Sequence, residues 1–339
     1  MRRYMTILSA TAALGIALLA TAIPAAACAG LIGSNGAVNL GRTTTLAAYH
    51  DGVEHYVTAF KFQGGGGQFG TLIPLPDVPT SVEKGGGWTL QRLQQETAPP
   101  RLLSRGVAAF AAADSVEVVL QTRVDALDLT VLKGGSQGVA AWATDHGFRL
   151  SPDAPEILEF YAARSPVFLA AVFDGDAAAA RGQEIGDGTP VQITIPTSNP
   201  WVPLRILGLG KQPGDRIEAD VFLLTDLRPS FLPQPRPGMA LAHNAAATSR
   251  LLDDLRSDER MEWVPTSAWL TKLGINSGAS DLAYDLAIDA TGNGAPSRVA
   301  AGLDPVETPQ PMNAVGLVAG LAIVLLGGEL AFRRFGFRG

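Results

Sequence analysis

The chain has 339 residues, of which 47% are hydrophobic and 17% charged, and a formal net charge of −6. Its two hydrophobic ends contain five arginines and Glu329, so the part between them keeps 21 basic and 31 acidic residues, a net charge of −10. This acidic balance argues against nucleic-acid binding, which needs clustered lysine and arginine. Cys28 is the only cysteine, which excludes an intramolecular disulfide.

The N-terminus has the pattern of a secretory signal peptide, predicted over residues 1–27. Arg2 and Arg3 precede an apolar stretch from Ile7 to Ile23, and Ala25-Ala26-Ala27 forms an Ala-x-Ala cleavage site. Cleavage after Ala27 makes Cys28 the first mature residue and leaves open whether Cys28 carries a lipid. An uncleaved N-terminal anchor is the alternative.

Residues 28–291 are predicted to form an extracytoplasmic α+β body with mostly antiparallel sheet. Asp51-Gly52 lies between strand-like runs at 43–49 and 54–62, which is a strong hairpin signal. Further strands are predicted at 68–75, 115–120, 127–132, 167–173, 191–195, 202–207 and 217–225. Short helices are predicted at 88–96, 139–146, 155–164 and 251–260, a proline-rich connector at 229–237, and a strand or short helix at 281–288.

The C-terminus is predicted to anchor the protein. A polar linker, 292–311, leads to an apolar segment, 312–332, that is just long enough for one transmembrane helix. Arg333, Arg334 and Arg338 follow it, which predicts a cytoplasmic tail at 333–339. A signal peptide also leaves the body outside, so both ends predict a single-pass protein of the cell membrane. A buried C-terminal helix is the alternative.

Four segments resemble a bacterial family known as domain of unknown function 2330. They are Cys28-Ala29-Gly30, Phe69 to Pro76, Val167 to Phe173, and Pro196 followed by Trp201 to Arg205. Thr71 stands where family members usually have an aromatic residue, and Ala29 where they have glycine. The resemblance implies a single exported body, often with a C-terminal anchor. It implies no activity and no site residues.

One segment matches the G-x-S-x-G pattern of serine hydrolases, at Gly134 to Gly138, between a predicted strand and a predicted helix. A triad built on Ser136 needs a carboxylate, such as Asp215 or Asp220, and an imidazole from His243 or His146. The predicted strands do not alternate with helices as a doubly wound sheet requires. Capping of the helix by Ser136 is therefore the favoured interpretation.

Metal sites are weakly indicated. His50 and His55 are five residues apart, which on one strand places them on opposite faces, so joint ligation is disfavoured. Asp174, Asp176 and Asp187 offer oxygens for Ca²⁺, but the rest of an EF-hand is missing, and an exposed acidic turn is favoured.

The remaining charged and aromatic residues are given structural roles. The carboxylates of the helix predicted at 251–260 are expected to form a solvated face with weak pairs to nearby arginines; they are Asp253, Asp254, Asp258 and Glu259. Core packing explains most of the five tryptophans, and Trp201 among prolines is the candidate for an exposed, ligand-facing position.

The sequence thus assigns no catalytic, cofactor-binding or metal-ligating residue. The predicted function is that of a membrane-anchored extracytoplasmic module that binds a protein or envelope ligand or contributes to envelope structure. Its partners are the membrane, through the C-terminal helix, and that ligand, but not nucleic acid. An exported serine hydrolase using Ser136 and a ligand-sensing module are the alternatives.

Overall fold

The structure is a computed structural model that describes residues 25–26, 30–33, 39–40, 42–60, 62–63, 69–98, 120–174, 178, 180 and 189–306. The predicted membrane span, 312–332, lies outside them, as do residues 1–24 of the predicted signal peptide and most of the strand predicted at 115–120. In the described part of the chain no helix is both long and apolar enough to cross a membrane. One compact unit ends at Asp304, and Pro305–Gly339 form a second unit.

The largest element of the body is an eight-stranded sheet in the order β16-β17-β14-β4-β5-β12-β8, with β1 as an extra partner of β4. The strands are β1 (Ala25–Ala26), β4 (Arg42–His50), β5 (Val53–Phe60), β8 (Ser81–Lys84), β12 (Thr189–Pro196), β14 (Arg216–Thr225), β16 (Met239–Ala246) and β17 (Trp269–Gly278). Neighbouring strands of this sheet run antiparallel, except that β4 runs parallel to β14 and to β1. Cleavage after Ala27 would remove β1 and leave β4 paired with β5 and β14.

The predicted hairpin between β4 and β5 is confirmed. Asp51 and Gly52 form its turn with φ angles of +48° and +79°, and both positive values match the two-residue turn that suits the twist of paired strands. The turn sets the register that places His50 opposite Val53 and Ala48 opposite His55.

A second sheet of five antiparallel strands has the order β2-β7-β11-β10-β9. Its strands are β2 (Gly30–Gly33), β7 (Phe69–Pro74), β9 (Leu120–Val124), β10 (Leu127–Lys133) and β11 (Val167–Phe173). A three-stranded sheet has the order β13 (Trp201–Val202), β18 (Leu286–Asp289) and β15 (Ser230–Leu232). A two-stranded sheet pairs β3 (Asn39–Leu40) with β6 (Phe62–Gln63). The mostly antiparallel α+β body predicted from the sequence is therefore correct.

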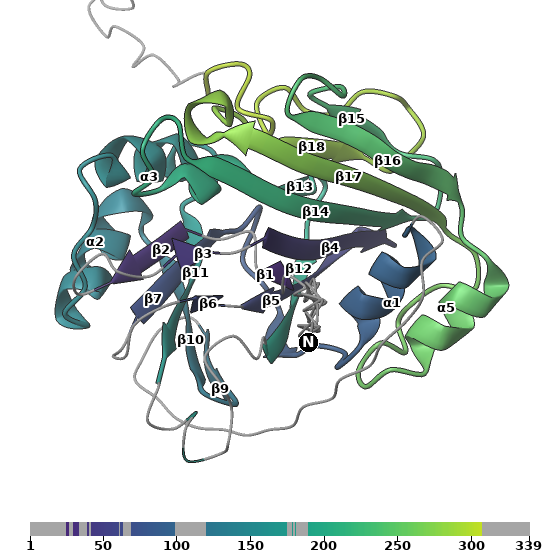
Figure 1. Cartoon of the computed structure of the whole chain (residues 1–339), viewed down its shortest axis with the longest axis horizontal. Coiled ribbons are helices and arrows are strands. Elements are labelled where there is room, and N and C mark those ends of the chain that lie inside the picture. The colour runs from purple at the N-terminus through teal and green to yellow at the C-terminus, as the bar shows by residue number, and fades with distance from the viewer. Residues whose placement is uncertain are drawn as a thin grey trace, which may run out of the picture. The chain divides into compact units, whose positions relative to one another are not determined.

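Helices cover the outer faces of the two main sheets (Figure 1). They are α1 (Thr89–Glu96) and α5 (Ser249–Arg256) on the large sheet, and α2 (Gly135–Asp145) and α3 (Ala154–Ala162) on the five-stranded sheet. Short 3-10 turns lie at η1 (Arg205–Gly208) and η2 (Ala279–Asp281). Three hydrophobic clusters fill the space between the sheets and under each helix pair.

The sequence of β11 shows why these layers form. All seven of its residues are buried. The side chains at the odd-numbered positions from 167 to 173 pack between the sheets. Those at the even-numbered positions, Phe168, Ala170 and Val172, pack under α2 and α3. A strand covered on both faces is apolar throughout, because its side chains alternate between two cores.

Three segments differ from their predicted structure. The strand predicted at 202–207 ends at Val202, and η1 follows because the backbone N–H groups of Leu204 and Arg205 donate to Asp285. The edge strand β16 and its neighbour β17 were not predicted. Residues 292–304, predicted as the start of a linker, belong to the compact body, and Ala301 within them is fully buried.

A buried ion pair joins α3, η1 and β18. Arg164 donates to Asp285 at 2.6 Å, and both side chains are at most 5% exposed. The other Asp285 oxygen accepts bonds from the Tyr161 hydroxyl and from the backbone of Leu204 and Arg205. Because every partner is polar and close, the cost of burying the charges is offset.

We expect Asp285→Asn to destabilise the protein by about 3 kcal/mol, because it leaves the buried Arg164 without its counter-charge. Chemical unfolding of the full chain in detergent measures this loss. Asp304→Asn is the control, since it breaks the exposed pair with Arg298 and should change stability little. Equal effects of the two substitutions would contradict the role given to Asp285.

Candidate functional site

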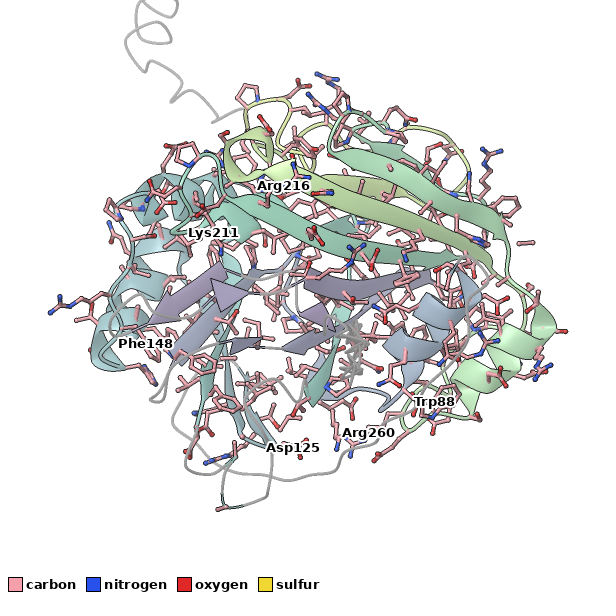
Figure 2. The ribbon with its side chains drawn as sticks, in the orientation of Figure 1. Trp88, Asp125, Phe148, Lys211, Arg216 and Arg260 are labelled. Carbon is pink, nitrogen blue, oxygen red and sulfur yellow. The ribbon has the colours of Figure 1, made fainter. Side chains whose placement is uncertain are left out.

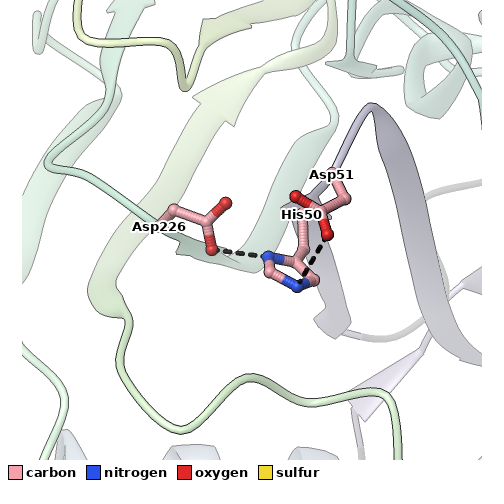
Figure 3. Close-up of side chains that lie close together, drawn as sticks. All are labelled: His50, Asp51 and Asp226. Atoms are coloured by element: carbon pink, nitrogen blue, oxygen red, sulfur yellow. Dashed lines mark hydrogen bonds and ion pairs between the residues drawn. The ribbon is translucent and has the colours of Figure 1, made fainter.

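The described residues bring one histidine and two aspartates together at the surface (Figure 3). His50 Nδ1 lies 2.7 Å from an oxygen of Asp226, and Nε2 lies 3.5 Å from an oxygen of Asp51. One ligand atom from each residue lies within 4.8 Å of the others. Asp51 and Asp226 are exposed and His50 is half-buried, so the cluster is open to solvent.

The parallel pairing of two strands creates this cluster. Tyr49 of β4 is in register with Thr225 of β14. His50, the last residue of β4, and Asp226, the first residue after β14, therefore lie side by side at the same end of the two strands, although 176 positions separate them in the sequence. Asp51 follows in the hairpin turn and completes the cluster.

The prediction that His50 and His55 lie on opposite faces is wrong. It treats the two residues as parts of one strand, whereas the Asp51-Gly52 turn folds β5 back beside β4. His55 is paired with Ala48, which shares its face with His50 because residues two apart on a strand point the same way. Both imidazoles therefore lie on the face that also carries α1 and α5.

His55 is held by an aromatic stack. Its ring lies 3.9 Å from that of Trp263, with 3° between the planes, and Trp263 Nε1 donates to Gln192. Burial, with a smaller contribution from the charge of His50, lowers the pKa of His55 to about 4. The imidazole is neutral at pH 7, which suits a ring packed against indole.

Ser136 is not arranged as a nucleophile. Its hydroxyl donates to Glu159 of α3 at 2.9 Å, and among the described residues it has no imidazole partner. His146 is bonded to the carbonyl of Trp142 on the same helix, ten residues from Ser136 or about 15 Å along the axis. The strands on either side of α2, β10 and β11, are antiparallel, whereas a nucleophile elbow lies on a parallel sheet.

The remaining triad candidates have other roles. Asp215 accepts from the backbone of Gln212, Asp220 pairs with Arg42 and Lys272, and His243 lies on the edge strand β16. The expected N-cap role of Ser136 is also wrong. Gly134, with a φ of +152°, occupies the N-cap, which places Ser136 inside the first turn of α2.

The acidic helix is only partly the solvated face that was predicted. Asp253 pairs with Arg256, and Asp254 pairs with Arg92 of α1. Asp258, however, is buried, and it accepts bonds from the backbone N–H groups of residues 87, 88 and 89. It thereby satisfies the donors at the start of α1, where the residue at the N-cap, Trp88, supplies no side-chain bond.

The other candidates have simple outcomes. Asp174 pairs with Arg123, while Asp176 and Asp187 lie outside the described residues. Trp201 is 3% exposed and stacks on Tyr161, so it is a core residue and not a ligand-facing one. Trp88, labelled near α1 in Figure 2, is the most exposed of the five tryptophans, at 37%.

Comparison with protein families gives one assignment. The family model DUF2330, described as an uncharacterized protein conserved in bacteria, matches residues 22–228, which is more than half of the chain. The chain belongs to this family. The matched region includes His50, Asp51 and Asp226.

Other comparisons add little to the DUF2330 assignment. A comparison with curated proteins gives no match. Two solved structures of baculovirus P35, one of them a mutated form after caspase cleavage, cover 77% and 75% of this chain and 99% of their own. Their identities are 8% and 7% and their TM-scores 0.40 and 0.39. Scores this low do not establish a shared fold.

The segments that resemble DUF2330 build the core of this member. Phe69–Pro74 and Val167–Phe173 are β7 and β11, paired residue by residue, with the Phe69 and Phe173 rings stacked at 4.9 Å. Trp201 to Arg205 contact Tyr161 and Asp285. These segments supply core residues of the body, and they lie apart from the His50 cluster in the sequence.

Glu54 is a buried carboxyl on the other face of β5. It is fully buried beside Tyr49 and Ile195, and neither oxygen makes a hydrogen bond of ordinary geometry with another described residue. Burial raises its pKa to about 8, and the backbone N–H of Trp201 offsets part of the rise. The carboxyl of this DUF2330 member is therefore protonated at pH 7.

This burial predicts a pH dependence of stability. A raised folded-state pKa means that the folded protein holds a proton that the unfolded chain releases above about pH 4.5, its ordinary value. The contribution of Glu54 is complete below that pH and is lost as the pH rises to about 8, with a slope of about 1.4 kcal/mol per pH unit.

We expect Glu54→Gln to remove this slope, as measured by urea unfolding of the full chain in detergent across the same pH range. Glu262→Gln, which removes an exposed carboxyl, is the control and should keep the wild-type profile. An unchanged slope in Glu54→Gln would show that Glu54 ionises normally in the folded protein.

Proposed function

We propose that this DUF2330 protein is a membrane-anchored extracytoplasmic module that binds a protein or envelope ligand or contributes to envelope structure. The observation that carries the proposal is the pair of terminal hydrophobic segments. The first has the signal-peptide pattern, and the second is followed by Arg333, Arg334 and Arg338. Together they support a topology with the body outside the cell membrane and the tail in the cytoplasm.

The body's own chemistry supports a non-enzymatic role. Its buried charges are used in structure: Asp285 binds Arg164, Asp220 binds Arg42 and Lys272, and Asp258 holds the start of α1. Ser136, the candidate nucleophile, is bonded to Glu159. A nucleophilic serine needs an adjacent base, and a carboxylate without an imidazole does not match that arrangement.

Cysteine labelling of intact cells with a membrane-impermeant maleimide tests the topology. We expect Leu227→Cys to add labelling above that of the wild type, because Leu227 is 55% exposed on the body. Arg338→Cys should add labelling only after the membrane is permeabilised. Met239→Cys, at a position 2% exposed, is the control for buried thiols of a folded body. Labelling of Leu227→Cys only after permeabilisation would overturn the proposed topology.

Affinity capture of the anchored chain from solubilised membranes tests the binding role. A partner recovered with the wild type and reproducibly lost in surface variants of the body supports that role. Recovery of the chain alone contradicts it and leaves envelope structure as the proposal.

A serine-directed fluorophosphonate probe tests the hydrolase alternative. We expect the full chain to remain unlabelled, since among the described residues Ser136 contacts the Glu159 carboxylate and no imidazole that could raise its reactivity. Labelling that disappears in Ser136→Ala would establish the enzyme instead.

A further inference from the structure

We propose that His50, Asp51 and Asp226 form a binding site for a divalent transition-metal ion, and that zinc fits it best. The three residues come from the end of β4, the hairpin turn and the end of β14 (Figure 3). One nitrogen and two carboxylate oxygens already lie within 4.8 Å of one another. The proposal does not depend on where the body lies relative to the membrane.

The ligand types select the class of ion. An imidazole with two carboxylates suits zinc and its neighbours among the first-row metals. Ca²⁺ is disfavoured, because it takes six to eight oxygen ligands and the cluster offers too few. Three protein ligands also leave a fourth tetrahedral position for water, as in the open zinc sites of proteins.

The side chains must rotate before all three ligands can reach one ion. Tetrahedral zinc places its ligand atoms about 3.3 Å apart. The two carboxylates lie beside different nitrogens of the same ring, Asp226 at 2.7 Å from Nδ1 and Asp51 at 3.5 Å from Nε2, so one of them must turn toward the nitrogen that binds the ion. The backbone that carries two of the ligands is fixed by the register of β4 and β14, so binding requires rotation of exposed side chains and no movement of the sheet.

The charge balance points to a cation. Among the described residues, neither Asp51 nor Asp226 forms an ion pair with lysine or arginine. Carboxylates elsewhere in the body do so, as Asp220, Asp254 and Asp285 show. With a neutral imidazole the cluster carries two negative charges that pair with no lysine or arginine in the described part of the chain, whereas a divalent ion balances both.

Another interpretation is a surface ion pair, in which a protonated His50 joins the hairpin to the end of β14. This arrangement uses the same contacts but binds no metal, and exposed pairs of this kind contribute little to stability. Direct measurement of metal binding separates the two interpretations.

The test is calorimetric titration of the tag-free full chain in detergent with ZnCl₂ alone, and with CaCl₂ for comparison. We expect the wild type to bind a single zinc ion, and zinc to raise the midpoint of thermal unfolding. His50→Ala should abolish this binding, and Asp226→Asn should weaken it about tenfold or more. His243→Ala removes a histidine from a different strand and should bind zinc as the wild type does.

Circular dichroism of each variant controls for folding, and Asp226→Asn, which nearly keeps the side-chain volume, provides a second variant. The proposal is overturned if the wild type takes up no zinc, if folded His50→Ala binds zinc as tightly as the wild type, or if calcium binds as well as zinc. These outcomes leave the topology experiment unaffected, so failure of the site and failure of the proposed function are distinguishable.

Discussion

Strand β4 is hydrogen-bonded on one side to β5, which runs antiparallel to it, and on the other to β14, which runs parallel. A two-residue turn makes the first pairing local, whereas the second joins segments far apart in the chain. With both neighbours fixed, the register of the central sheet is fixed, and a shift of one residue would exchange its two buried faces. The inter-sheet core, the α1–α5 cluster and the His50 cluster all depend on this register.

Buried polar groups mark where the layers are joined. Asp285 and Arg164 connect a strand, a helix and a 3-10 turn, and Asp258 connects the end of α5 to the start of α1. Both carboxylates accept several donors, which offsets the cost of removing charge from water. Glu54 differs because, among the described residues, only the backbone N–H of Trp201 offsets its burial, and the net effect raises its pKa and favours the neutral form. The body thus uses carboxyl groups in two ways, as paired ions and as a protonated acid in an apolar core.

The proposed zinc site lies at the surface. Its ligands leave the sheet where two parallel strands end, an arrangement that also gathers functional residues in open parallel sheets. The proposed membrane-anchored module and the proposed site are compatible, since a surface site on an exported body is accessible to ions outside the cell. Neither proposal requires the serine that the hydrolase pattern singled out.

Local patterns in the sequence were sufficient for the β4–β5 hairpin, for β11 and for the helices near 88–96 and 155–164, because each depends on neighbouring residues. They also carried the family resemblance, which the DUF2330 match confirms. The alanine-rich strand β16 was missed because an exposed edge strand shows little hydrophobic alternation.

The tertiary structure decided three features of the candidate sites. They are the shared face of His50 and His55, the buried role of Asp258, and the contact between His50 and Asp226. Each depends on how one segment is placed against another, and the spacing of residues along a chain does not contain that information. The chain's composition and terminal patterns predict where the protein is located. Strand pairing across 176 residues decides which side chains can act together.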